Sequence, residues 1–249
     1  MPVLAPGITW IPTRPHDRNN AYLVEGDDGF TLVDVGWASA PKLLTDALED
    51  LDCSVSDIRR IVLTHAHPDH VKGAAELRSL SGAHVLIHAA DADWLRFGQV
   101  PASGRSGRIG RCADRLPLLH WKPVEPDGTV THGDVIEHSN GLRVVHTPGH
   151  SPGHIALLHE PTGVLLVGDA VFHGRDGLSQ GPAAFSIDPV AREQSLSSLP
   201  VDVSAVGFAH GSPFIGGAVG VYTAWMEASA RLTRPAAESG RTNQEGGQL

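Results

Sequence analysis

The 249-residue chain holds only two cysteines, Cys53 and Cys112, and no CxxC pair, which excludes a disulfide framework. It contains no run of about 18 apolar residues, so we expect no membrane span. Its first residues, MPVLAPGITWIP, lack the basic and then apolar pattern of a signal peptide. A cytoplasmic protein is therefore the expectation.

Basic residues are also scarce, with 19 Lys and Arg against 28 Asp and Glu and a net charge of -9. This balance disfavours nonspecific binding to nucleic acid or to anionic lipid, so we expect neither as a partner. A hydrophobic content of 41% is typical of a folded chain. Histidine is abundant instead, with 15 residues, several of them clustered. Imidazole is the commonest side-chain metal ligand and the usual proton carrier near neutral pH.

Short strands and helices alternate along the chain in two βα-rich halves. The apolar patterns predict strands at 21–25, 30–35, 61–64, 83–88, 142–147, 154–158, 164–168 and 203–208, with GDDG as a hairpin turn between the first two. They predict helices at 40–51, 70–81, 89–97, 188–199 and 217–233, with Ser39 and Asp188 as N-caps and Pro189 in the first turn. We expect one domain over residues 1–234, with an inserted loop or cap at 98–128 and a disordered tail at 235–249.

The HAHPDH segment at 65–70 places four metal-capable side chains within six residues, between a predicted strand and a predicted helix. Its first two histidines, His65 and His67, would point the same way on an extended chain. The proline then turns the chain, so Asp69 and His70 can face the same space. Imidazoles grouped in this way repel when protonated and need partners when buried. A metal ion meets both requirements, and the segment therefore predicts a metal site.

Three later segments each place a metal-capable residue beside small residues where a strand runs into a turn. They are Thr147-Pro148-Gly149-His150, Gly168-Asp169-Ala170 and Ala209-His210-Gly211. Loops at strand ends are the normal place for function in layered α/β folds. A lone GD or HG is usually only a turn, but in this order after HAHPDH the three segments form a specific pattern.

Together, HAHPDH, TPGH, GDA and AHG resemble the motifs of the metallo-β-lactamase-fold hydrolases. LVDVG at 32–36, after NNAYLVEG, resembles the N-terminal strand pair of that family. The resemblance spans residues 19–215, nearly the whole predicted domain. It implies an α/β fold, a four-layer αββα sandwich, with metal ions at one edge between the two sheets.

The resemblance also implies a ligand set: His65, His67 and His150 for one metal ion, Asp69, His70 and His210 for a second, and Asp169 as a bridge between them. Nitrogen and oxygen ligands suit two zinc ions, and also iron or manganese. A water between two such cations ionises near neutral pH, and this metal-bridging hydroxide would attack the substrate carbonyl. Asp69 would orient the hydroxide and carry its proton, which makes it the catalytic candidate.

Further candidates stand alone in the sequence. Asp34, in LVDVG, would either accept the remaining ring N–H of a ligand histidine or cap the end of a strand. His173 is a candidate for substrate contact, whereas His154 fits a structural role better than ligation. The stretch 96–122 carries six Lys and Arg against Asp114 alone. These charges fit either a cap that attracts an anionic substrate or a solvated mobile loop.

The predicted function is the hydrolysis of a small ester, thioester or lactone by a dinuclear metal enzyme, with a small acyl molecule as its partner. The alternatives are a mononuclear iron oxygenase similar to the persulfide dioxygenases and a β-lactamase-type amide hydrolase. GDAVFHGRDGLSQG lacks the GCGR-like segment of glyoxalase II and of the persulfide dioxygenases, which argues against both. The expected absence of a signal peptide argues against a secreted β-lactamase. No oligomeric state is implied.

Overall fold

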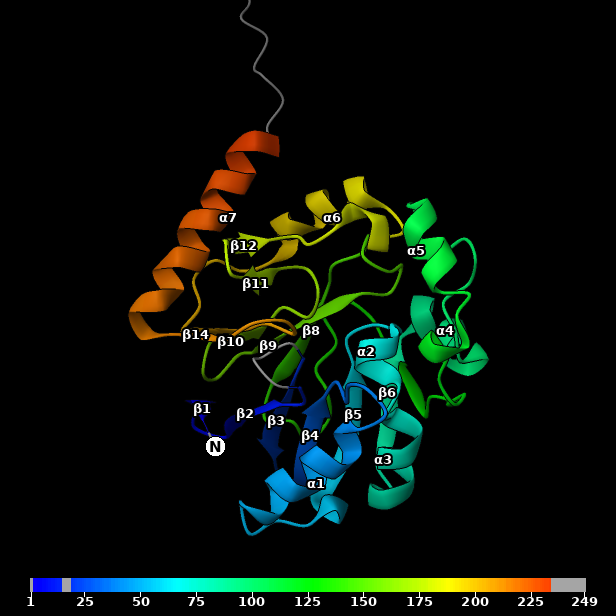
Figure 1. Ribbon diagram of the computed structural model, residues 1–249. Coiled ribbons are helices and arrows are strands. Elements are labelled where there is room, and N and C mark those ends of the chain that lie inside the picture. Colours follow the sequence, from blue (N-terminus) through cyan, green and yellow to red (C-terminus); the bar gives the residue numbers. More distant parts are fainter. Residues whose placement is uncertain (1, 15–18, 234–249) are drawn as a thin grey trace, which may run out of the picture.

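The computed structural model describes residues 2–14 and 19–233, so the predicted tail at 235–249 lies outside the described residues (Figure 1). Two β-sheets form its centre. The first contains, in chain order, β1 (Val3–Ala5), β2 (Ile8–Pro12), β3 (Asn20–Gly26), β4 (Gly29–Val33), β5 (Ile58–Leu63), β6 (His84–His88) and β7 (Gly128–Val130). The second has the order β14 (Phe214–Ile215), β13 (Ala205–Gly207), β10 (Val164–Leu166), β9 (Ile155–His159) and β8 (Leu142–His146). A separate hairpin pairs β11 (Phe172–Gly174) with β12 (Gly177–Ser179).

Helices cover both outer faces of the pair of sheets. The α-helices are α1 (Ala40–Glu49), α2 (Pro68–Val71), α3 (Ala74–Ser81), α4 (Ala92–Phe97), α5 (Arg108–Ala113), α6 (Pro189–Ser195) and α7 (Val219–Thr233). The 3-10 turns are η2 (Val55–Asp57), η3 (Ala89–Asp91), η4 (Pro117–Leu119), η5 (Ala183–Phe185), η6 (Leu196–Ser198) and η7 (Gly216–Ala218). In Figure 1, α1 and α3 lie on one outer side and α6 and α7 on the opposite side. Among the described helices, none combines the length and the apolar composition that a bilayer crossing requires.

The described residues form three hydrophobic cores, which lie between four layers: helices, the first sheet, the second sheet and helices. In β3, Leu23 packs into the core that also contains residues of α1 and α3, whereas Val24 packs into the core between the sheets. In β10, Leu166 belongs to the core between the sheets and Leu165 to the core beneath α7. Successive side chains of a strand point to opposite faces, so each sheet is apolar on both sides. The predicted αββα sandwich is confirmed.

The strand directions bring distant segments to one edge. Strands β4, β5, β6 and β7 run parallel to one another. In the second sheet, β9 is antiparallel to both β8 and β10, and β13 is parallel to β10. The strands β8, β10 and β13 therefore all run in the same direction. Segments that follow them in the sequence start from the same edge of the second sheet.

The sequence patterns located most elements but not all of their ends. The expected helix 70–81 is two helices, because α2 ends at Val71 and α3 begins at Ala74. Gly73 lies between them at a close contact, where an added Cβ would come within 2.9 Å of Val35 and Pro41 side-chain atoms. Asp188 accepts cap hydrogen bonds at 3.0 Å, as predicted. Ser39 stands at the N-cap of α1, but its side chain accepts no cap hydrogen bond.

Candidate metal centre

Strand β5 delivers the HAHPDH segment to the edge of the first sheet. The backbone of His67 is still extended (φ -111°, ψ 153°), and Pro68 then begins α2. The His67 carbonyl accepts hydrogen bonds from the N–H groups of His70 and Val71 at 3.0 and 3.1 Å, which closes the first turn. The rings of His65 and His70 are buried with centroids 4.1 Å apart. Three imidazoles of one short segment therefore gather in one buried place.

The second sheet brings three more candidates to this place, because His150 follows β8, Asp169 follows β10 and His210 follows β13. Asp169 lies in the middle of the cluster. Its Oδ2 lies 3.2 Å from His150 Nε2 and 4.0 Å from His65 Nε2. Its Oδ1 lies 3.3 Å from both His70 Nε2 and His210 Nε2. The carboxylate of Asp169 therefore faces both halves of the cluster.

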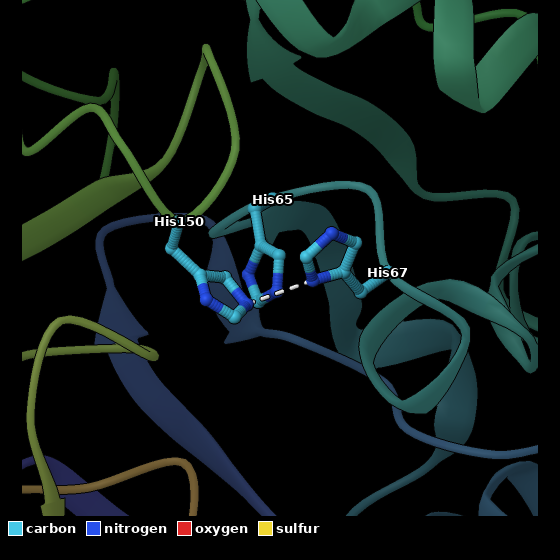
Figure 2. A group of neighbouring side chains, drawn as sticks. All are labelled: His65, His67 and His150. Atoms are coloured by element: carbon cyan, nitrogen blue, oxygen red, sulfur yellow. Dashed lines mark hydrogen bonds between the residues drawn. The ribbon is translucent and has the colours of Figure 1, made fainter. Parts of the chain in front are cut away.

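Donor atoms of the cluster fall into three groups, each within 4.8 Å: His65 with His67 and His150, His65 with His70 and Asp169, and Asp69 with His70 and His210. The first and third groups are the two ligand sets that the family resemblance implies. Figure 2 shows the three rings of the first group meeting from two loops, with His67 Nδ1 2.8 Å from His150 Nε2. In the third group, Asp69 Oδ2 lies 3.3 Å from His210 Nε2. The structure thus brings together all seven predicted ligand residues.

The residues present fit a metal ion. His65 Nε2, His70 Nε2 and Asp169 Oδ1 are buried and have no hydrogen-bond partner within the described part of the chain. Buried polar atoms are rarely left unsatisfied in folded proteins, and a bound cation would satisfy all three. The set of imidazoles and carboxylates, without a thiolate, suits zinc, iron or manganese.

Burial and neighbouring charges set the protonation of these residues. Burial lowers the pKa of His150 to about 4, so its ring is neutral at pH 7 and free to act as a ligand. Burial also opposes the charged form of His210, but the carboxylates of Asp169 and Asp69 outweigh it and raise its pKa to about 10. Burial opposes the charged form of His70 too, but the carboxylates of Asp34, Asp169 and Asp69 outweigh it and raise the pKa of His70 well above its ordinary value. The carboxylates therefore draw positive charge to this half of the cluster, where a cation would replace the protons.

Asp34 holds the HAHPDH segment from outside the cluster. Its Oδ2 lies 2.9 Å from His70 Nδ1 and accepts the Thr64 hydroxyl at 2.8 Å, and its Oδ1 accepts the Thr64 N–H at 2.8 Å. Asp34 adopts a left-handed backbone conformation, with φ 58°, which is uncommon for a residue other than glycine. The contacts of Asp34 fit both hypotheses from the sequence, since it caps the end of β5 and also orients the ring of His70.

Asp91 was missed by the sequence analysis. Its buried carboxylate accepts hydrogen bonds from the Ala66 N–H at 3.1 Å, the Ser151 hydroxyl at 2.5 Å and the Gly153 N–H at 2.6 Å. It therefore ties the segment after β5 to the loop after β8. The only sequence signal is AADAD at 89–93, whose two aspartates form no pattern that indicates such a role.

His154 supports Asp169 rather than joining the cluster of donor atoms. Its Nε2 accepts the Asp169 N–H at 2.8 Å, and its Nδ1 lies 2.7 Å from the Thr147 hydroxyl. The ring is therefore occupied on both nitrogens, as the expected structural role requires. His173 adjoins His210, because its N–H donates to the His210 carbonyl at 3.0 Å, but its ring belongs to none of the three groups of donor atoms and has its Nδ1 2.7 Å from the Ser212 carbonyl.

A cavity of about 330 Å³ opens onto the cluster. Its polar lining is His67, Asp69, Arg105, Asp114, His150, Asp169, Arg192 and His210, and its apolar lining is Trp37, Pro68, Leu119, Phe172, Pro182 and Phe185. A wider and more open basin of about 850 Å³ shares Trp37, Asp69, Phe172 and His210 with it and extends to His173. The smaller cavity is at the low end of the range for ligand sites, which suits a small substrate group.

The insert reaches this cavity with Arg105, Asp114 and Leu119. Arg105, buried between α4 and α5, pairs with Asp114 at 2.8 Å, donates to the Phe185 carbonyl and lies 3.4 Å from His67 Nδ1. Arg96, by contrast, pairs with Glu125 at the surface. The positive charges of the insert are therefore partly neutralised, and only part of the region is loop, because α5 and η4 lie within it.

An αββα sandwich with imidazoles and carboxylates gathered at its strand ends is typical of one class of proteins, the metal-dependent hydrolases with an αββα fold. The chain also matches the family model of the metallo-beta-lactamase superfamily over residues 14–210, and it belongs to that superfamily.

Named relatives agree with this class. The chain is 30% identical over 194 residues to the human acyl-coenzyme A thioesterase MBLAC2, which covers 69% of this chain and 66% of the relative. It is 26% identical to the hydroxyacylglutathione hydrolase GloC of Haemophilus influenzae, over 69% of this chain and 75% of the relative. A metallo-beta-lactamase of Cronobacter sakazakii with a HARLDQ motif superposes with a TM-score of 0.70 at 20% identity, over 92% of each chain, which shows the shared fold. The prediction of a metal-dependent hydrolase is confirmed as an enzyme class.

Proposed function

We propose that this chain is a dinuclear metal-dependent hydrolase of a small ester, thioester or lactone. One observation carries the proposal: five imidazoles and two carboxylates from both sheets converge at the floor of a small cavity. A purely structural cluster of this composition would leave several buried polar atoms unsatisfied. Zinc as the metal and a cytoplasmic location remain predictions from the sequence.

We assign the ligands by the groups of donor atoms. One cation would be held by His65, His67 and His150, a second by Asp69, His70 and His210, and Asp169 would serve both. When bound, the two cations supply an acidified water as nucleophile and polarise the scissile carbonyl.

Asp69 is the residue best placed to handle a proton. Its side chain is partly exposed to the cavity, while Asp169 is buried. Burial opposes the charged form of Asp69, but His70 and His210 outweigh it and lower its pKa, so it is a carboxylate at pH 7. We assign its Oδ2 to orient the attacking water and to accept its proton.

The names of the relatives point to thioesters as the substrate class. The human relative is named as an acyl-coenzyme A thioesterase and the Haemophilus influenzae relative as a hydroxyacylglutathione hydrolase. The small cavity would take the acyl group, and the wider basin that adjoins it would take the leaving group. Both features support a thioesterase more than a β-lactamase-type amide hydrolase.

The test is elemental analysis of the purified protein, followed by assays with thioesters, lactones and β-lactams. We expect about two zinc ions per chain and chelator-sensitive thioester hydrolysis. One iron per chain with oxygen consumption would instead establish the alternative, a mononuclear iron oxygenase.

The ligand assignment is tested with Asp69→Ala and His150→Ala. Both changes should lower the metal content and abolish turnover while the circular dichroism spectrum stays the same, because each removes a donor without emptying a hydrophobic core. Asp46→Ala and His84→Ala are matched controls, since both side chains are exposed and away from the cavity. Full metal occupancy in the two site variants would contradict the assignment.

A further inference from the structure

Three arginines are buried among the described residues: Arg60, Arg105 and Arg192. They differ in whether a carboxylate neutralises the guanidinium charge. Arg60 pairs with Asp28, and Arg105 pairs with Asp114. Arg192 forms no ion pair with any described carboxylate, although its exposed fraction is only 3%. A buried charge without a partner is costly, so this guanidinium needs an explanation.

The neighbours of Arg192 are neutral groups. Its Nη1 donates to the Ser186 hydroxyl at 2.8 Å and its Nη2 to the backbone carbonyl of Asp169 at 2.6 Å. Its guanidinium lies 5.5 Å from the centre of the Phe172 ring. The buried Nε has no hydrogen-bond partner within the described residues. Burial lowers the pKa of Arg192 to about 10, so the group is still a cation at pH 7.

Arg192 also lines the cavity above the metal cluster. The one carboxylate that acts on its charge, Asp169, faces the histidines of the cluster and is assigned there as a ligand. Arg105 lines the same cavity, but Asp114 already neutralises it. With cations bound below, their charge and that of the two guanidinium groups would outweigh the carboxylates of Asp69, Asp114 and Asp169 in the lining. The cavity would then carry a net positive charge that an anionic substrate group could balance.

We propose that Arg192 is the specificity-determining residue of this cavity and that it binds a carboxylate at the far end of the acyl group. The inference rests on the proposed function. The substrate class is then a thioester or ester of a short dicarboxylic acid, with the scissile carbonyl at the metal cluster and the free carboxylate at the guanidinium. A planar guanidinium matches a carboxylate in geometry as well as in charge.

The experiment compares two thioesters with the same thiophenol leaving group, one with a glutaryl and one with a valeryl acyl group. They differ only in a terminal carboxylate against a terminal methyl group. For the metal-loaded wild-type enzyme we expect kcat/KM about 10-fold to 100-fold higher for the glutaryl thioester, the range of one charge-assisted hydrogen bond. In Arg192→Gln this ratio should fall to about one, and in Arg192→Lys, which keeps the charge, it should be intermediate.

The ratio of kcat/KM for the two thioesters distinguishes binding of the substrate carboxylate by Arg192 from a purely structural role. If Arg192 only supports the Asp169 carbonyl, then Arg192→Gln will lower both rates equally and leave the ratio unchanged, which would overturn the inference. Arg143→Gln is the matched control, because Arg143 is a half-exposed arginine of β8 that pairs with Glu160 and does not line the cavity. If Arg192→Gln does not fold, Arg192→Lys still tests the ratio.

The two proposals can fail separately. Equal wild-type rates with the two thioesters would overturn the role of Arg192 and leave the hydrolase standing. Turnover of neither thioester by a fully metal-loaded enzyme, together with no turnover of lactones, would overturn the proposed function and this inference with it.

Discussion

At the scale of single residues, the cluster depends on side chains that are not ligands. The ring of His70 has its Nδ1 2.9 Å from Asp34 Oδ2, while its Nε2 faces the Asp169 carboxylate at 3.3 Å and has no hydrogen-bond partner within the described residues. A carboxylate on the outer nitrogen fixes the tautomer and makes the inner nitrogen a better metal ligand. Asp34 would therefore act on a bound cation through His70.

Asp34→Asn tests this directly. Asparagine keeps the shape and tolerates the left-handed backbone, but an amide cannot accept hydrogen bonds at both positions as the carboxylate does. We expect the metal affinity to fall about 10-fold to 100-fold, measured by competition with a chelator. Asp46→Asn, at an exposed site on α1, is the control and should bind metal like the wild type. Unchanged affinity in Asp34→Asn would show that the carboxylate is only a cap.

The sequence could predict the seven clustered residues because metal-capable side chains at strand ends form a pattern. It could not predict the role of Arg192, since a lone arginine in a helix is usually a solvated residue. What distinguishes Arg192 is that it is buried and forms no ion pair within the described residues, which is a property of the folded structure. Asp91 was missed for the same reason, because its partners at 66, 151 and 153 come together only in the fold.

At the scale of elements, the short turn η3 joins the two halves of the site. Its N-cap is His88, whose Nδ1 accepts the Ala90 N–H at 3.2 Å, and Asp91 at its end holds loops of both sheets. The His88 ring is stacked on His146, with centroids 4.1 Å apart. A protonated His88 would lose its acceptor atom and bring a charge beside a second imidazole.

His88 therefore predicts a dependence of stability on pH. Burial, and then the neighbouring His146, lower the pKa of His88 from 6.5 to about 4. Between these two values the unfolded chain binds more protons at this residue than the folded chain does, so the free energy of unfolding falls as the pH falls from 6.5 to about 4. We expect His88→Asn, which keeps a capping oxygen, to lose less stability than the wild type in this window.

Urea unfolding at the two ends of the window is the measurement for His88→Asn. Other histidines titrate in both proteins, so only the difference between their slopes reports on His88. His84→Asn, at an exposed position of the same strand, should keep the wild-type slope. Equal slopes in wild type and His88→Asn would contradict the prediction.

The strands that the sequence patterns missed are short or lie near the edge of a sheet. β2 ends at Pro12, and β1 lies at the edge of the first sheet, where strands are brief and proline is tolerated. Strands β11, β12 and β14 have only two or three residues each, too few for an alternating pattern. The strands that carry the site, β5, β8, β10 and β13, were predicted from runs of buried apolar residues, although β10 and β13 have only three residues each.

At the scale of the whole molecule, the candidate metal centre joins the two sheets. Four of its residues follow β5 of the first sheet, and three follow strands of the second: His65, His67, Asp69 and His70, and then His150, Asp169 and His210. The unfolded chain cannot hold these seven side chains together, so cations at the proposed site would bind the folded state selectively. Metal binding would therefore be coupled to the association of the two sheets.

Chelation should accordingly lower the melting temperature. A ligand present at 1,000 times its dissociation constant stabilises the folded state by about 4 kcal/mol. For a chain of this length each kcal/mol is equivalent to about 2–4 °C, so we expect a decrease on the order of 10 °C with excess EDTA, reversed by added zinc. Differential scanning calorimetry measures the change. Asp169→Asn, which weakens both proposed ligand sets, should melt at nearly the same temperature with and without EDTA. A wild-type protein that loses all its metal without any change in melting temperature would show that the sheets hold together independently of the cations.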